Sequence, residues 1–95
     1  MNLSLIPALM SHGEICRAIG ARARMLREKQ NLSRRELQEK SGVSVPTISR
    51  FETSGVATVA VMVKLAKALG CADDLGEIFK APRYNSIADY LKEEA

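Results

Sequence analysis

The sequence predicts an all-α protein, a compact bundle of about five short helices, and three observations support this prediction. Apolar residues recur at helical spacing in one segment after another, and no segment has the apolar–polar alternation of a β-strand. Serine or threonine precedes several of these segments where a helix N-cap is expected. Glycine follows them where a helix is expected to end.

The composition indicates one domain with an aliphatic core. The chain has 95 residues, of which 46% are hydrophobic, but it contains no Trp and only two Phe and two Tyr. No apolar run approaches the roughly 20 residues that cross a bilayer. The apolar N-terminus lacks the basic start of a signal peptide. We therefore predict a cytoplasmic protein without a membrane segment.

The net charge of +3 hides an asymmetry along the chain. Residues 13–40 carry eight basic and four acidic side chains, and residues 41–69 carry three basic and one acidic. Residues 70–95 carry three basic and six acidic side chains. A basic region beside an acidic one suggests a polyanionic partner for the first. The alternative, merely solvated helix faces, stays open on charge alone.

The first expected helix spans about residues 12–29. Ser11 and Glu14 have the spacing of a capping box at its start. Gly20 lies inside this helix, where glycine costs about 1 kcal/mol relative to alanine. We expect another helix to approach closely at that point. The apolar stripe of this helix comprises Ile15, Ile19, Ala23 and Leu26.

Two shorter helices are expected next, from Ser33 to about Lys40 and from Ser44 to about Thr53. Ser33 is followed by a glutamate three residues later, which is a second capping box. Gly42 supplies the left-handed conformation that a tight exit from the first of them needs. The core between these two helices is expected to comprise Leu37, Val43 and Ile48.

Thr58 is the expected cap of a fourth helix, over about residues 59–69, and Gly70 ends it. Its predicted core-facing residues are Val59, Met62, Ala66 and Leu69. A short fifth helix is expected to begin near Asp73 and to stop before Pro82. Its predicted apolar face consists of Leu75, Ile78 and Phe79.

The domain organisation follows from these helices. Residues 1–10 are predicted to be an N-terminal arm or an extra turn that packs on the domain, because Pro7 prevents one regular helix with the residues that follow. Residues 11–81 form the predicted globular domain. Residues 82–95 form a predicted C-terminal tail, with a short helix over about 86–92 that caps the domain or mediates assembly.

The segment from Ser33 to Glu52 combines a helix, a glycine turn and a second helix, which is the pattern of a helix-turn-helix motif. In this motif the second helix enters the DNA major groove, which admits one helix, and its first residues point at base edges. The first helix crosses the backbone and holds the second in place. The alternative is a helical hairpin without a role in DNA binding.

From Ile19 to Leu69 the chain resembles the Cro/C1-type (XRE) family of helix-turn-helix regulators. The resemblance is carried by IGARARMLR, LSRRELQEKSGVSVPTISRFE and VKLAKALG, which cover a little over half of the chain. It implies a lambda-repressor-like fold of five helices. It also implies binding to operator DNA as a homodimer.

The resemblance assigns base contacts to the exposed side of the second motif helix. The residues there are Val45, Pro46, Ser49 and Arg50. The family often has Gln or another polar reader at the first two of these positions. Val45 could instead touch a thymine methyl group. Arg50 is then the strongest base reader, with guanine as the expected partner.

The resemblance also implies phosphate contacts and one structural ion pair. The expected phosphate-contacting residues are Ser33, Arg34, Arg35, Thr47 and Thr53. Arg34 replaces a family Gln that grips a phosphate, and the charge should strengthen that contact. The turn after the second motif helix lacks the basic residue often found there. Arg27 and Glu52 match a pair that orients the second motif helix.

Other chemistry finds little support in the sequence. His12 is the only histidine, and Cys16 and Cys71 lie far apart without a CxxC pattern. A zinc site is therefore improbable, and we expect two reduced thiols. No glycine-rich phosphate loop and no nucleophile–base pair is evident. We predict no cofactor, no metal and no enzyme activity.

Two hypotheses of function remain. In the first, the protein is a sequence-specific transcriptional regulator, a repressor that binds a pseudo-palindromic operator as a homodimer. In the second, it is the antitoxin of a toxin–antitoxin pair, which binds a toxin protein and regulates its own promoter. The acidic C-terminal region and residues 82–95, which the motif does not need, allow the second hypothesis.

Overall fold

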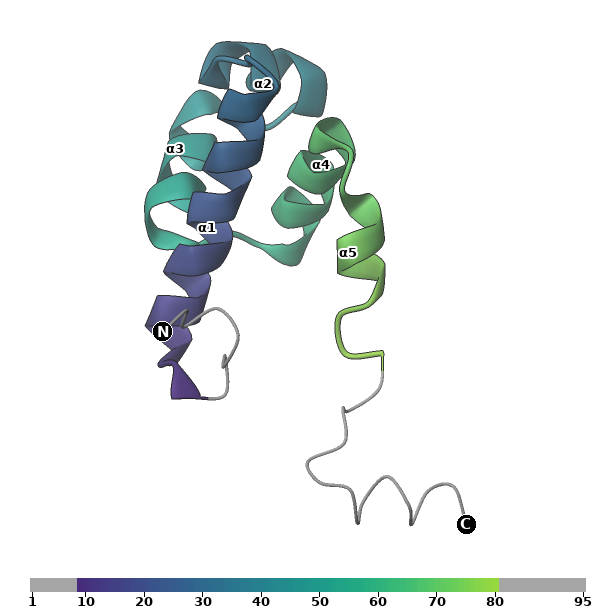
Figure 1. Cartoon of the computed structure of the whole chain (residues 1–95). Helices are drawn as coiled ribbons and strands as arrows, with labels where there is room; N and C mark the ends of the chain where they lie inside the picture. The colour runs from purple at the N-terminus through teal and green to yellow at the C-terminus, as the bar shows by residue number, and fades with distance from the viewer. Residues whose placement is uncertain (1–8, 81–95) are drawn as a thin grey trace.

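The computed structural model describes residues 9–80, and within this range it consists of five helices and no strands (Figure 1). The helices are α1 (His12–Lys29), α2 (Arg34–Ser41), α3 (Val45–Ser54), α4 (Val59–Leu69) and α5 (Ala72–Gly76). This confirms the all-α class. Most of the predicted arm and the predicted helix over 86–92 lie outside the described residues.

Local capping signals determine where the first four helices begin and end. Ser11 and Ser33 both form complete capping boxes, and Ser44 and Thr58 accept hydrogen bonds from the backbone two or three residues into α3 and α4. α2 and α4 end at glycines in the left-handed conformation, with φ of 78° at Gly42. Each predicted start and end of these helices agrees with the structure to within about one residue.

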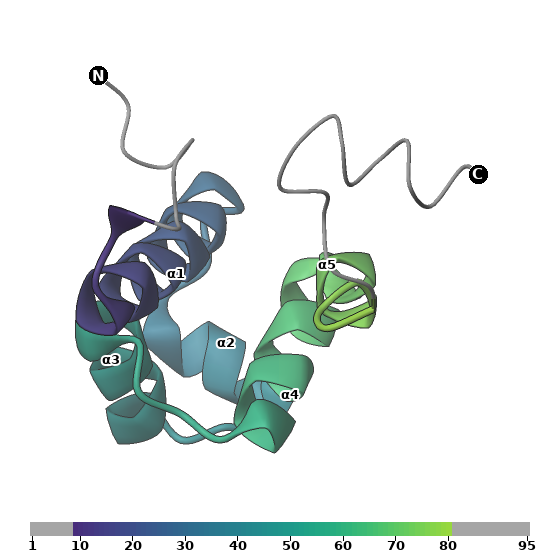
Figure 2. The same ribbon diagram turned by 90° about the horizontal axis from the view of Figure 1, so that it is seen from below.

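The core lies where α2, α3 and α4 converge beside α1 (Figures 1 and 2). Leu37, Val43 and Ile48 are buried, as predicted for the motif. α3 and α4 add Phe51, Leu65, Ala68 and Leu69 to the core cluster. The half-buried face of α1 packs against it, which anchors the motif to the longest helix.

α1 and α3 touch each other through backbone at two glycines. A Cβ atom on Gly20 would lie 2.1 Å from the carbonyl oxygen of Phe51. A Cβ atom on Gly55 would lie 1.9 Å from the carbonyl oxygen of Cys16, and its φ is 74°. The predicted close approach at Gly20 is confirmed, and its partner is the C-terminal end of α3.

Two expectations about the apolar faces are wrong. Val59 is 75% exposed, because the buried side of α4 is centred on Leu65 and Leu69. At 3.6 residues per turn, Val59 lies roughly a quarter-turn from that centre, in the first turn of the helix. α5 ends at Gly76, before it could align Ile78 and Phe79 with Leu75.

The residues after α5 consequently leave the expected apolar face. Ile78 is 50% exposed and Phe79 is fully exposed, with a positive φ of 61° that turns the chain. The N-cap residue of α5 is Cys71, and its side chain makes no capping hydrogen bond. None of the described helices is both long and apolar enough to cross a membrane.

Candidate nucleic-acid interface

The turn between α2 and α3 is held by hydrogen bonds from both helices. The Gly42 N–H donates to the Gln38 carbonyl at 2.8 Å, which closes α2. The Val45 N–H donates to the Gln38 side-chain oxygen, also at 2.8 Å. Gln38 therefore ties the end of α2 to the first residue of α3, and no sequence signal had singled it out.

α3 has a buried side and a solvent side. Ile48, Phe51 and Glu52 are buried against α1, α2 and the core. The predicted base-contacting residues lie on the other side or at its edges. Pro46 and Arg50 are exposed, and Val45 and Ser49 are half-buried. The burial of α3 thus leaves its N-terminal half accessible to a ligand.

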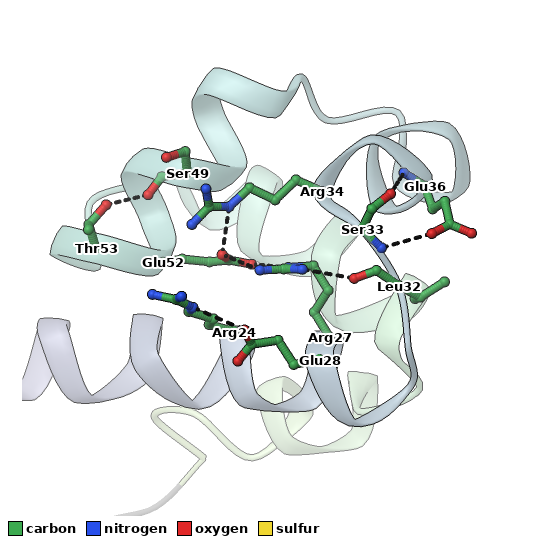
Figure 3. A network of polar contacts seen from close by, with 10 residues as sticks. All are labelled: Arg24, Arg27, Glu28, Leu32, Ser33, Arg34, Glu36, Ser49, Glu52 and Thr53. Carbon is green, nitrogen blue, oxygen red and sulfur yellow. Dashed lines mark hydrogen bonds and ion pairs between the residues drawn. The ribbon is translucent and has the colours of Figure 1, made fainter.

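Glu52 is the centre of a buried ion-pair cluster that joins three helices (Figure 3). Arg27 Nε donates to Glu52 Oε2 at 2.7 Å, and Arg27 Nη2 donates to Oε1 at 3.0 Å. Arg27 Nη1 donates to the Leu32 carbonyl at 2.8 Å, in the loop before α2. The structure therefore brings Arg27 and Glu52 together in a two-pronged pair, a geometry that the planar guanidinium favours.

Arg34 is a third member of this cluster. Its Nε donates to Glu52 Oε1 at 2.9 Å, and its side chain is 33% exposed, against 1% for Glu52. A cation in the first turn of a helix is unfavourable next to the positive end of the helix dipole, so the carboxylate offsets that cost. Because only Nε is bonded to Glu52, the two Nη groups remain available to a ligand. Two guanidinium groups around one carboxylate leave the cluster with a net positive charge.

The ionisation of this cluster is shifted toward the charged forms. Burial alone would raise the pKa of Glu52, but the hydrogen bonds and charges of Arg27 and Arg34 together lower it below its ordinary value of 4.5. The hydrogen bond to Glu52 raises the pKa of Arg27. The cluster therefore stays ionised well into the acidic range.

The hydroxyl groups predicted to contact phosphates differ in whether their own proton is free to donate a hydrogen bond. Ser33 Oγ accepts from the Glu36 N–H at 3.0 Å, and Thr47 Oγ1 accepts from the Ser44 hydroxyl at 2.9 Å. Both keep their own proton free for a further hydrogen bond. The Thr53 hydroxyl donates to the Ser49 carbonyl, so its proton is already engaged. Arg35 is exposed on α2.

A shallow groove adjoins the solvent side of α3. Pro46, Thr47 and Arg50 form one wall, and the loop before α4 forms the other with Val56 and Thr58. The lining of this second wall is apolar or hydroxylic, in line with the missing basic residue in that turn. Among the described residues that line the groove, Arg50 is therefore the only cation.

The sequence matches the family model for helix-turn-helix domains over residues 24–75, which is more than half of the chain. The protein belongs to the Cro/C1-type (XRE) helix-turn-helix family. Membership makes it a sequence-specific DNA-binding protein of a family that regulates transcription and is typically non-enzymatic. No curated protein matches the chain at a significant level.

Proposed function

We propose that the protein is a repressor that binds a pseudo-palindromic operator as a homodimer, with α3 in the major groove. The observation that carries this proposal is the division of α3 into a buried side and a solvent side. A helix held in this way can present its first turns to base edges without moving. A domain that occupies its operator blocks transcription where the operator overlaps a promoter.

Arg50 is the proposed base reader, and guanine is its proposed partner. It is exposed in the middle of α3, and arginine contacts guanine O6 and N7 with two hydrogen bonds in the major groove. Ser49 and the apolar Val45 and Pro46 would supply contacts of lower specificity. Sequence preference should therefore centre on one G·C pair in each half-site.

Arg34 is the proposed phosphate contact at the start of α2. Glu52 holds the guanidinium by Nε, so the Nη groups would meet a phosphate in a fixed orientation. The hydroxyl protons of Ser33 and Thr47 would add neutral contacts beside it. Contacts of this kind position the protein on DNA and carry no sequence information.

Selection of bound sequences from random DNA tests this proposal with the wild type and three variants. Arg50→Ala should relax preference at one base position and weaken the selected site by roughly 1–3 kcal/mol. Arg34→Ala should weaken all sequences and reduce the slope of affinity against salt by about one phosphate contact. Lys80→Ala is the control, because Lys80 follows α5 in the chain, and α5 and α3 lie on opposite sides of the bundle (Figure 2).

The wild type should select two half-sites about one helical turn apart, and light scattering of the complex should give two chains per site. Transcription in vitro from a promoter that contains the site should fall as protein is added. A single half-site, or an Arg50→Ala variant that selects the wild-type sequence at unchanged affinity, would overturn the docking. An antitoxin role, which rests on residues outside the described range, stays a prediction.

A further inference from the structure

An apolar groove of about 510 Å³ lies between α1 and the α4–α5 end of the molecule. Ile19, Ala23 and Leu26 form the α1 wall, and Leu75 and Ile78 form part of the opposite wall. α1 and α5 stand apart in both views, with α4 and α2 closing the far side (Figures 1 and 2). This groove is separate from the solvent side of α3. The α3 residue that lines it is Phe51, which is buried.

The groove leaves apolar surface uncovered that belongs to the periphery of the core. Ile19, Ala23, Leu26 and Met62 pack against the core but are only partly buried, and Ile78 is half-exposed. Covering such surface is favourable, because apolar groups leave water. A segment with an apolar edge would therefore be stabilised by lying in this groove.

Residues 86–94 have such an edge. Ile87, Tyr90 and Leu91 recur at the i, i+3 and i+4 spacing of a helix face. From residue 86 to residue 94 a helix rises about 12 Å at 1.5 Å per residue, and the α1 wall from Ile19 to Leu26 rises about 10 Å by the same measure. The segment is therefore long enough to lie along this wall, and its apolar edge from Ile87 to Leu91 covers about 6 Å of it.

The position of the chain also favours this segment. Ile78 already lines the groove, and the last described residue, Lys80, follows it directly. The five residues 81–85 reach at most about 18 Å, enough to turn the chain back.

The N-terminal residues 1–8 meet these conditions less well. They join α1 at Ser11, two turns before Ile19. We infer that residues 86–94 of the same chain fold back as a short helix and fill the groove between α1, α4 and α5.

Cys71 provides a direct measurement, because it lines the groove, whereas Cys16, whose backbone packs on Gly55, does not line it. Thiol modification of the full chain at one pH gives a separate rate for each cysteine, identified by peptide mass. The variant Ile87→Asp/Leu91→Asp should speed modification of Cys71 relative to the wild type. The increase should be roughly tenfold if the docked arrangement is populated ten to one. The rate at Cys16 should not change.

A matched variant tests the other end of the chain. Leu3→Asp/Ile6→Asp should leave the Cys71 rate unchanged, and an increase there instead would identify the N-terminal residues as the occupant and overturn the inference. If Cys71 of the wild type is modified slowly at high protein concentration and faster on dilution, a second copy covers the groove. That result would also overturn the inference. No change in either variant would mean that neither segment covers it.

The Ile87→Asp/Leu91→Asp variant could also increase the modification rate at Cys16 by destabilising the whole fold. A disulfide cross-link decides that case. In a Cys16→Ser background, Ile87→Cys, Tyr90→Cys and Leu91→Cys are oxidised one at a time in dilute solution. At least one should form an intramolecular disulfide with Cys71, which requires Cα atoms within about 7 Å. Lys92→Cys, on the opposite side of the expected helix, is the control. Failure of all three, or equal cross-linking of the control, would overturn the inference.

Discussion

The two sides of the helical bundle, α1–α3 and α4–α5, are held together in different ways. On the α1–α3 side, backbone touches backbone at Gly20 and Gly55, and a buried ion-pair cluster fixes α2 and α3 to α1. On the α4–α5 side, apolar contacts and one hydrogen bond, from Gln30 Nε2 to the Leu69 carbonyl at 2.8 Å, join α4 to α1, and a groove stays open toward α1. The first side carries the proposed DNA-reading helix. The difference indicates that rigidity is concentrated where α3 must be presented in one orientation.

The largest effect is expected from Glu52→Gln, which breaks the cluster on the rigid side. Removing the charge leaves the buried Arg27 without its ionised partner, and breaking a buried pair in this way costs about 3–5 kcal/mol. Chemical denaturation at pH 7 measures the free energy of unfolding. A loss below about 1 kcal/mol would mean that the cluster contributes no more than an exposed ion pair.

A similarly large effect is expected from Gly20→Ala, because the new Cβ would collide with the Phe51 carbonyl oxygen. Forcing the helices apart should cost about 3 kcal/mol. The matched control is Gly76→Ala in α5, where a Cβ atom meets nothing within 4 Å and φ is not positive. That change should be neutral or stabilise the protein by up to about 1 kcal/mol. Equal losses in the two variants would contradict the contrast between the two sides of the bundle.

Acid should weaken the rigid side through Glu52. Its pKa is lower in the folded protein than the ordinary value of 4.5, so the unfolded chain binds the proton more readily. The stabilisation is complete above that ordinary value and is lost as pH falls through the folded pKa. The difference in unfolding free energy between the wild type and Glu52→Gln should therefore shrink as pH falls below about 4.5. A difference that stays constant from pH 7 to pH 3 would contradict this assignment.

The smallest effect is expected from Glu28→Gln, which removes the exposed pair of Arg24 and Glu28 on α1. Both side chains are about half exposed, and a pair at i, i+4 on a helix surface contributes only about 0.3–0.5 kcal/mol. The same denaturation measurement applies. A loss as large as that of Glu52→Gln would show that burial is not what makes the Glu52 cluster important.

The sequence predicted the framework of the candidate site well, because its determinants are local. Ser33, Gly42 and Ser44 act on backbone groups within about four residues, so their positions delimit α2 and α3 without knowledge of the rest of the fold. The residues expected on the solvent side of α3 came from the family resemblance.

Other features of the site depend on residues far apart in the chain. That Arg34 shares Glu52 with Arg27 could not be derived from spacing, since 18 residues separate it from Glu52. The sequence interpretation gave Arg34 a phosphate alone. The family resemblance suggested the Arg27–Glu52 pair but not its third member.

The sequence by itself determined the first four helices, their ends and the glycine turn, because capping and left-handed glycine are decided within a few residues. The tertiary structure decided which side of each helix is buried, which separates the exposed Val59 from the buried Leu65. It also decided what Gly20 touches and left the groove beside α1. These features arise from the approach of distant segments, and burial and close contact depend on where those segments meet.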